Sequence, residues 1–418
     1  MTSLHLVQIP VIIAVARATG CLFEKFGQPR VAGEMVAGIM LGPSLLGWLA
    51  PGLSAALFSP ASLPLLNSFS QIGLVMFLFL VGLENDPAQL RGHREAVVLT
   101  SHASITLPFF LGVLLAMALY PHFADSSVTF MQFALFMGVS MSITALAVLA
   151  RVLEEQGLRN TPIGAIAIVC AAVDDATGWL VIALVLLLTQ GQTGHLPMWL
   201  TLVCTAAYLG TMLGLVPKGL RWLWARYREK GNGKVNGNVL ACALLLTFAS
   251  ASLTEYISLH PLFGGFVAGL VMPRDPDLLR ALRAKIQDIT LVLLLPLFFA
   301  LSGLRTQLGM LNDLESWLFF GAILGVAVVG KFGGASFAAH ATGLRWRHAA
   351  EIGVLVNSRG LMELVVLNIG ADIGVVSPRL FTTAVLMAIV TTLMAPPILR
   401  RLHRHHAQER EAAPAPSS

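Results

Sequence analysis

The sequence predicts an all-α polytopic membrane protein, on three grounds: its composition, the length of its apolar runs and the placement of its positive charges. Charged residues make up 12% of the 418 residues and hydrophobic residues 56%, whereas a soluble domain typically carries about 25% charged residues. The mean hydropathy is +0.77. The net charge of +5 does not indicate nucleic-acid binding, because that function needs basic residues clustered on a soluble face.

Apolar runs long enough to cross a bilayer follow one another along the whole chain. A transmembrane helix needs about 20 apolar residues to cross a hydrocarbon core of roughly 30 Å. We therefore expect thirteen transmembrane helices, at 4–22, 31–49, 63–82, 96–119, 129–150, 162–189, 198–216, 238–259, 261–272, 286–304, 317–339, 350–370 and 380–399. The ninth run is short because a proline bounds it at each end.

The positive charges predict the orientation of these helices. Of the 27 Lys and Arg residues, 22 fall in the C-terminal tail or in the loops that follow odd-numbered runs. Short cytoplasmic loops carry such an excess, so we expect the N-terminus outside and the C-terminus in the cytoplasm. Residues 1–400 are expected to form one membrane domain, and residues 401–418 a disordered, basic cytoplasmic tail.

Two segments of the first half recur in the second half. Gly33–Leu41 is similar to Gly264–Met272, and Phe79–Glu84 is similar to Phe299–Arg305. The second and ninth runs enter the bilayer from opposite sides on the charge pattern, which predicts inverted repeats at about 31–189 and 261–399. Secondary transporters use such repeats around an ion site near the midplane.

Small residues four positions apart recur in several of the runs. Such spacing typically lets two transmembrane helices approach closely. We expect helix contacts at Gly38/Gly42, Gly265/Gly269, Gly321/Gly325 and Gly330/Gly334.

Three ionisable side chains are predicted to lie at mid-membrane depth. Asp174 and Asp175 follow Pro162 by 12 and 13 residues, or about 18–20 Å of helix, and Lys331 lies about 21 Å beyond its own helix start. Each such charge costs about 2.5–3.5 kcal/mol at the bilayer centre, so a function is expected. Neighbouring helix residues point in different directions, so one aspartate can meet Lys331 while the other faces a cavity. A purely structural ion pair leaves the second aspartate unexplained.

A midplane carboxylate in a hydrated cavity can hold either a proton or a small cation. Competition between the two for one site predicts antiport of a monovalent cation against protons, with Na⁺, K⁺ and Li⁺ left open. The four cysteines are scattered without a C-x-x-C spacing, so we expect no cofactor and no metal other than the transported ion.

Polar residues inside two runs predict interrupted helices, whose free carbonyls and partial charges complement an ion. The fifth run contains Ser142 and Thr144, and the twelfth contains Asn357 and Arg359. Arg359 and Glu363 are spaced to compensate one another. At the cytoplasmic end of the second run, where the run begins, Glu34 is expected to pair with Arg30 at the membrane interface.

Several motifs together resemble the monovalent cation:proton antiporter-2 branch of the sodium/hydrogen exchanger superfamily. The similarity covers nearly all of residues 5–400 and is carried by Gly27–Ser44, Val81–Glu84, Ser142–Ala145, Val173–Trp179, Pro296–Gly303 and Ser358–Gly370. It implies the fold of NhaA and NapA, in which a homodimer of dimerisation and core domains holds two crossed, unwound helices. The localisation it implies is a bacterial inner membrane.

The same resemblance implies a role for each candidate residue. Asp175 would be the principal cation and proton ligand, and Asp174 would pair with Lys331. Ser142 and Thr144 would lend oxygens to the ion from the unwound stretch. Electrogenic exchange of two protons per cation is implied because the aspartate pair and the lysine are all present. The regulatory C-terminal domain of potassium-efflux members and the long tail of plant members are not expected here.

Three alternatives to antiport remain open from the residues. An intramembrane aspartyl protease needs its two aspartates on separate helices, which adjacent Asp174 and Asp175 do not supply. A sodium-coupled organic-solute symporter is compatible with the same fold. A cation channel is disfavoured because no carbonyl-filter motif is present.

Overall fold

A computed structural model describes residues 4–84, 94–158, 161–190, 197–229, 235–257 and 259–412, and every regular element in these ranges is helical. The π-helical turns are η2, η3 and η5, and η4 is a 3₁₀ turn. The elements are α1 (Leu4–Lys25), α2 (Arg30–Leu41), α3 (Leu46–Leu49), α4 (Pro51–Leu57), α5 (Leu63–Glu84), α6 (Arg94–Phe123), α7 (Phe130–Ser142), α8 (Leu146–Glu155), α9 (Pro162–Gln190), α10 (Met198–Gly210), η2 (Thr211–Leu215), α11 (Val216–Glu229), α12 (Gly237–Tyr256), α13 (Pro261–Leu270), α14 (Pro276–Asp288), η3 (Ile289–Leu294), α15 (Leu295–Arg305), η4 (Leu308–Met310), α16 (Leu314–Val328), η5 (Val329–Gly333), α17 (Gly334–Ala341), α18 (Trp346–Val356), α19 (Leu361–Asp372) and α20 (Pro378–Ala412).

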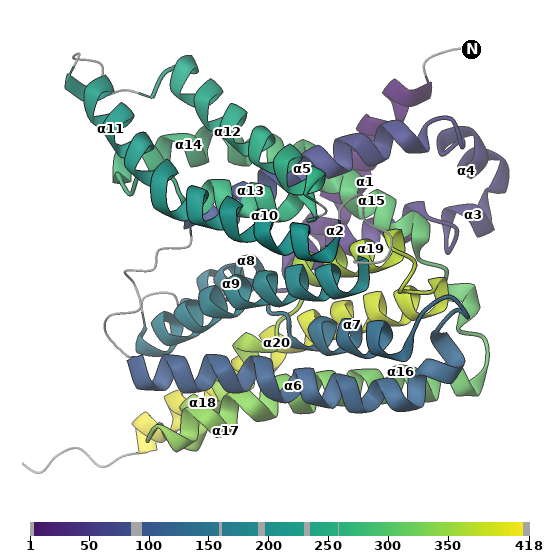
Figure 1. The fold of residues 1–418 in the computed structure, drawn as a ribbon. Coiled ribbons are helices and arrows are strands. Elements are labelled where there is room, and N and C mark those ends of the chain that lie inside the picture. Colours follow the sequence, from purple (N-terminus) through teal and green to yellow (C-terminus); the bar gives the residue numbers. More distant parts are fainter. Residues whose placement is uncertain are drawn as a thin grey trace, which may run out of the picture.

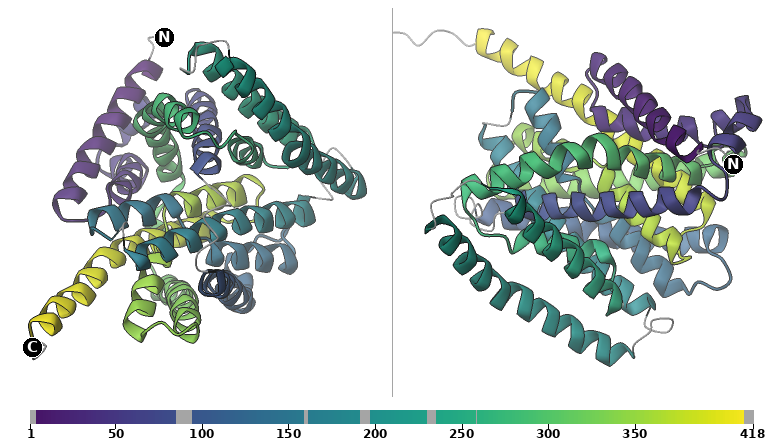
Figure 2. Two further views of the ribbon diagram at one scale, coloured as in Figure 1. Left: turned by 90° about the vertical axis from the view of Figure 1, so that its left-hand side faces the viewer. Right: turned by 90° about the horizontal axis from the view of Figure 1, so that it is seen from above.

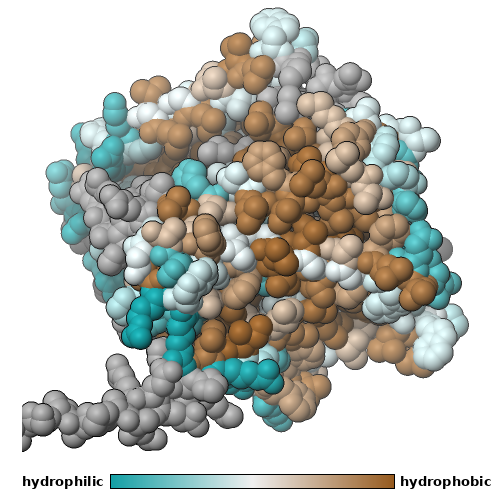
Figure 3. All heavy atoms as spheres, turned by 90° about the horizontal axis from the view of Figure 1, so that it is seen from below, coloured by the Kyte–Doolittle hydropathy of each residue, from teal (hydrophilic) through white to brown (hydrophobic). Residues whose placement is uncertain are grey.

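The prediction of an all-helical membrane protein is confirmed. Nine helices in the described ranges are long and apolar enough to cross a membrane, and α18 with α19 forms a tenth, bent candidate. Each of the thirteen predicted runs coincides with one helix or with an interrupted one, while the number of crossings stays a prediction. The surface agrees with this assignment. Figure 3 shows one face of the molecule with apolar side chains across its middle and hydrophilic side chains gathered at its two ends.

The helices form two groups that lie one above the other in Figure 1. The first group contains α1–α5 and α10–α15, and the second contains α6–α9 and α16–α20. In both views of Figure 2 the long helix that runs through α10 and α11 lies at the edge of the molecule, on the side opposite α1. The predicted site residues all belong to the second group or to the breaks between its helices.

Close helix contacts relate the two predicted repeats. A Cβ added at Gly38 would lie 2.0 Å from the carbonyl oxygen of Phe299, and one added at Gly303 would lie 1.9 Å from the carbonyl carbon of Gly38. In the same way, a Cβ added at Gly82 would lie 2.1 Å from the Phe266 carbonyl oxygen, and one added at Gly269 would lie 2.1 Å from the Phe79 carbonyl oxygen. Thus α2 packs on α15 as α5 packs on α13. A two-fold relation between the repeats would produce this pairing.

Three of the four predicted small-residue contacts are present, and the fourth is not made within the described chain. The spacings at Gly38/Gly42, Gly265/Gly269 and Gly330/Gly334 all lie against neighbouring helices. By contrast, a Cβ added at Gly321 or Gly325 would meet nothing within 4 Å in the described chain. Both glycines are exposed on the surface of α16.

Two local predictions are corrected by the structure. The tail was expected to be disordered from residue 401, but α20 continues through Ala412, because Leu, Arg, Gln, Glu and Ala in this stretch favour helix. Residues 413–418 lie outside the described part. Arg30 pairs with Glu24 at 2.9 Å rather than with Glu34, which is 6% exposed within α2. Glu34 therefore faces the interior, whereas the Arg30 side chain points toward Glu24.

Candidate ion site at two helix breaks

Two interrupted helices meet next to the aspartates. Residues 143–145 separate α7 from α8, and residues 357–360 separate α18 from α19, whose axes differ by 44°. Thr144, Asn357 and Ser358 are of residue types with weak helix propensity, which favours a break at these points. The Ala145 backbone N–H donates to the Ser358 carbonyl at 3.4 Å. This bond joins the two breaks directly.

Asp174, on α9, is fully supplied with hydrogen-bond donors. Its Oδ1 accepts from Ser101 Oγ at 2.8 Å. Its Oδ2 accepts from Ser104 Oγ at 2.6 Å, from Thr144 Oγ1 at 2.7 Å and from Lys331 Nζ at 3.2 Å. Four donors around a carboxylate that is 1% exposed compensate for the water it has lost. The arrangement stabilises a buried negative charge at a fixed position.

Lys331 ties a third segment of the chain to this carboxylate. Its Nζ is completely buried and donates both to Asp174 and to Thr144 Oγ1. The residue lies in the π-helical turn η5, between α16 and α17. Such turns inside α-helices often occur at functional sites. Thr144 thus accepts from the lysine and donates to the aspartate, so the break after α7 is part of the ion pair.

Asp175 differs from Asp174 in having an unused oxygen. It is 4% exposed and accepts a backbone hydrogen bond from Leu146, the first residue of α8. Its Oδ1 has no hydrogen-bond partner within the described part of the chain. The partial positive charge of the α8 N-terminus favours an anion here. Asp175 therefore has room to bind a further ion or proton.

A small cavity adjoins the two aspartates. Its volume is about 10 Å³, close to the space for one water molecule. The residues around it come from α9, α19 and the first break, and they are Ile143, Asp174, Asp175, Gly178, Ile182, Met362 and Val366. The cavity lies between α9 and α19, so both aspartates border space that is not filled by side chains.

A second buried ion pair closes the end of α7. Arg359 Nη1 donates to the Ser140 carbonyl and to Glu363 Oε2, each at 2.7 Å, and Nη2 donates to the Met141 carbonyl. Glu363 also accepts a hydrogen bond from Ser140 Oγ. These carbonyls lie at the C-terminal end of α7, where a helix leaves acceptors free and favours a cation. The Arg359–Glu363 pair therefore satisfies the broken helix.

The structure brings together most of the residues predicted from the sequence, with two exceptions. Ser142 Oγ donates to the Val139 carbonyl of its own helix and makes no described contact with either aspartate. Asn357 Oδ1 has no described partner. Sequence reasoning missed Ser101 and Ser104, although two serines spaced by three residues in an apolar run form one polar helix face, which is a usable signal.

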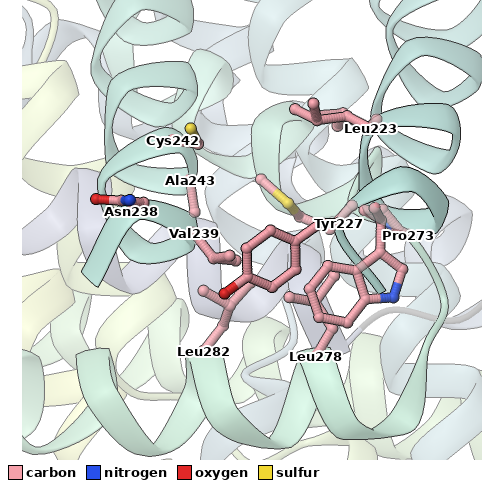
Figure 4. A pocket seen from close by; sticks show the side chains of 12 residues that line it. Leu223, Tyr227, Asn238, Val239, Cys242, Ala243, Pro273, Leu278 and Leu282 are labelled. Atoms are coloured by element: carbon pink, nitrogen blue, oxygen red, sulfur yellow. The ribbon is translucent and has the colours of Figure 1, made fainter. Parts of the chain in front are cut away.

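A pocket with a larger volume than the cavity beside the aspartates lies elsewhere in the described structure. It has a volume of about 150 Å³ and lies between α11, α12 and α14. Figure 4 shows Leu223 and Tyr227 of α11 across from Val239 and Ala243 of α12. None of the candidate site residues lines it, and its walls are mainly apolar. The small polar centre beside the aspartates is therefore the candidate ion site, and this pocket is not.

Comparison with known proteins decides the family. The model of the transmembrane sodium/hydrogen exchanger matches residues 11–404. The chain belongs to the sodium/hydrogen exchanger family. It is 40% identical over 403 residues to the Na⁺/H⁺ antiporter NhaS4 of Synechocystis, covering 96% of this chain and 97% of that protein.

Other relatives in the exchanger family are longer. The chain is 32% identical to K⁺/H⁺ antiporter 1 of Saccharomyces cerevisiae and 36% identical to cation/H⁺ antiporter 17 of Arabidopsis thaliana, each over 96% of its length. It spans only 46% and 48% of those two proteins.

The fold is shared with a solved exchanger. The sodium/proton antiporter MjNhaP1 of Methanocaldococcus jannaschii superposes with a TM-score of 0.63 over 95% of both chains, at 14% sequence identity. At this identity the likeness concerns the fold alone. It agrees with the antiporter fold that the sequence motifs imply.

Proposed function

We propose that this protein is a secondary active antiporter that exchanges a monovalent cation, Na⁺ or K⁺, for protons at Asp175. The observation that carries the proposal is the contrast between the neighbouring aspartates. Asp174 is occupied by four donors, whereas Asp175 keeps one oxygen without a described partner beside a cavity. The names of the exchanger relatives from Synechocystis and yeast support cation/proton antiport.

Charge balance explains why the two substrates would compete. The contacts described above contain three buried acids, Asp174, Asp175 and Glu363, and two buried bases, Lys331 and Arg359. The two ion pairs cancel, which leaves the charge of Asp175. One proton or one monovalent cation neutralises it, and binding both would leave an excess charge in a low-dielectric interior. Binding of one substrate therefore releases the other.

Alternating access would follow from movement between the two helix groups. The proposed ligands lie in the group formed by α6–α9 and α16–α20, so this group would carry the ion past α1–α5 and α10–α15. The packing of α2 on α15 resembles that of α5 on α13, and this likeness supports inverted repeats in the first group of helices. A homodimer, with the C-terminus in the cytoplasm, completes the proposal.

Electrogenic exchange requires a second proton for each cation. Lys331 is the group positioned to provide it, because cation binding next to Asp174 weakens the ion pair that keeps the ammonium charged. We propose two protons per cation. A flux that does not respond to an imposed membrane potential would contradict this stoichiometry and leave antiport itself standing.

The test is an exchange assay in proteoliposomes that carry a proton gradient and a pH-sensitive dye. Sodium, lithium, potassium and choline are added in turn to wild type and to Asp175→Asn. We expect proton efflux with at least one inorganic cation and its loss in the variant. Asp277→Asn is the matched control, because that carboxylate is 72% exposed and pairs only with Arg280 among the contacts described.

Other outcomes would separate the alternatives. Proton movement that needs an organic solute together with sodium would favour symport. Cation flux without proton movement would favour a channel. Full activity of Asp175→Asn in folded protein would contradict the proposed site.

A further inference from the structure

Two serines on α6 donate hydrogen bonds to Asp174 in addition to the groups at the first helix break. Ser101 and Ser104 are completely buried, and their hydroxyl groups lie 2.8 Å and 2.6 Å from Oδ1 and Oδ2 of Asp174. Ser104 Oγ also lies 2.8 Å from the Ser101 carbonyl, so the carboxylate is its nearer acceptor. Together the two serines donate one hydrogen bond to each oxygen of the same carboxylate.

We propose that Ser101 and Ser104 are positioning residues that keep Asp174 ionised and in place when Lys331 gives up its proton. This inference rests on the proposed antiport function. If Lys331 alone compensated Asp174, neutralising the lysine would leave a buried carboxylate without adequate donors, and the proton would pass to Asp174 instead of leaving the site. With the serines present, three hydroxyl donors remain, because Thr144 also donates to Oδ2.

The separation of roles follows from the bonding of each aspartate. No described contact joins Ser101 or Ser104 to Asp175, which receives its hydrogen bond from the Leu146 backbone. The serines therefore act on the ion pair and leave the exchanging carboxylate free. They restrict titration to Asp175 and Lys331, which is the condition for a fixed number of protons per cation.

Other ionisable groups face this centre from the neighbouring elements. Asp175 and the Cys170 thiol interact with Asp174 from α9, and Lys331 interacts with it from η5. Arg359, in the second break, and Glu363, on α19, act on Lys331. The hydrogen bonds described for Lys331, Arg359 and Glu363 do not involve the serine hydroxyls, so removal of the serines takes away two donors of Asp174 and leaves the two ion pairs in place.

The experiment measures the pH profile, the cation KM and the reversal potential of antiport for wild type, Ser101→Ala, Ser104→Ala and the double alanine variant. The double variant loses two hydrogen bonds to the buried carboxylate, so we expect its half-maximal activity to move by about one pH unit or more to higher pH. The reversal potential should move toward electroneutral exchange. The KM at high pH should stay within about twofold of wild type.

Matched variants make the result decisive. Ser336→Ala removes a buried serine on α17 whose Oγ has no described partner, and it should change none of the three measurements. Ser101→Thr and Ser104→Thr keep the hydroxyl group and should restore the wild-type pH profile. Size-exclusion chromatography and thermal unfolding identify folded protein, and the single variants provide smaller shifts if the double variant does not fold.

Several results would overturn the inference. An unchanged pH profile in the folded alanine variants would do so, as would threonine variants that behave like the alanine ones. A raised KM without a pH shift would make the serines cation ligands instead. These results differ from failure of the proposed function, in which wild type itself would show no cation-driven proton flux.

Discussion

At the scale of single residues, Arg359 shows how one side chain can stabilise a broken helix. Its guanidinium group, 1% exposed, donates to two carbonyls at the end of α7 and to Glu363. A lysine offers one compact ammonium group and does not reproduce this planar fork. Arg228, which pairs with Asp275, is 57% exposed and therefore has water as an alternative partner.

The first prediction compares these two arginines. We expect Arg359→Lys to lower the free energy of unfolding by about 3 kcal/mol, because buried acceptors lose donors. Arg228→Lys should change it by less than about 1 kcal/mol. Denaturant unfolding in detergent measures both values, and equal losses in the two variants would contradict the assigned role.

The second prediction concerns pH and Asp275, which lies just before the apolar segment that begins at Pro276. The hydrogen bond from the Trp224 indole, with further bonds from the Leu278 and Asp277 backbone and the charge of Arg228, lowers the pKa of Asp275 below its usual 3.8. A lowered pKa stabilises the fold above the unfolded value, and this contribution disappears as pH falls through the folded value. Wild type should therefore exceed Asp275→Asn in melting temperature at pH 7.

The melting temperatures of the two proteins should converge as the pH falls below about 4. Asp277→Asn, a change at an exposed neighbour, provides the control for general acid sensitivity. A difference between wild type and Asp275→Asn that stays constant down to pH 3 would show that the carboxylate charge is not responsible.

At the scale of helices, glycine contacts decide how closely the repeats approach. Gly38 and Gly269 each lie against a backbone carbonyl of a facing helix, whereas Gly321 and Gly325 face open space in the described chain. The same spacing of small residues therefore has different consequences on α2, α13 and α16. Only the partner helix distinguishes them.

The third prediction uses this difference. Gly38→Ala and Gly269→Ala should each lower the free energy of unfolding by about 1–3 kcal/mol, because a methyl group forces rigid backbones apart. Gly321→Ala should be neutral or should stabilise by up to about 1 kcal/mol, since alanine favours helix. Unfolding measurements on the three variants test the prediction, and a large loss in Gly321→Ala would indicate a contact absent from this single chain.

At the scale of the whole molecule, a cluster of polar contacts connects the two helix groups. Arg305 of α15 pairs with Asp372 of α19 at 2.7 Å and donates to Asn368 at 3.0 Å. Asn368 in turn donates to Ser302 of α15 at 2.8 Å. If the groups move past one another during transport, this cluster must break. It therefore stabilises the arrangement described here.

The fourth prediction tests this connection by exchanging charges. Arg305→Glu and Asp372→Arg should each change the antiport rate by about two- to fivefold, in line with about 0.5–1 kcal/mol for a partly exposed pair. The double variant should recover most of the wild-type rate. The Arg283–Glu84 pair, at 3.0 Å between α14 and α5, lies within one group, and its exchange should leave the rate unchanged.

The amino-acid sequence was sufficient to predict the membrane class and the positions of the helices, and it also predicts the depth of Asp174, Asp175 and Lys331. A bilayer imposes these features locally, because each crossing segment must be apolar and must satisfy its own backbone. Depth alone left either aspartate free to face Lys331, and the family motifs implied Asp174. Only tertiary structure showed that Ser101, Ser104 and Thr144 surround that carboxylate and that Ser142 does not. Such contacts depend on how helices distant in sequence are rotated against one another, and no local pattern specifies that rotation.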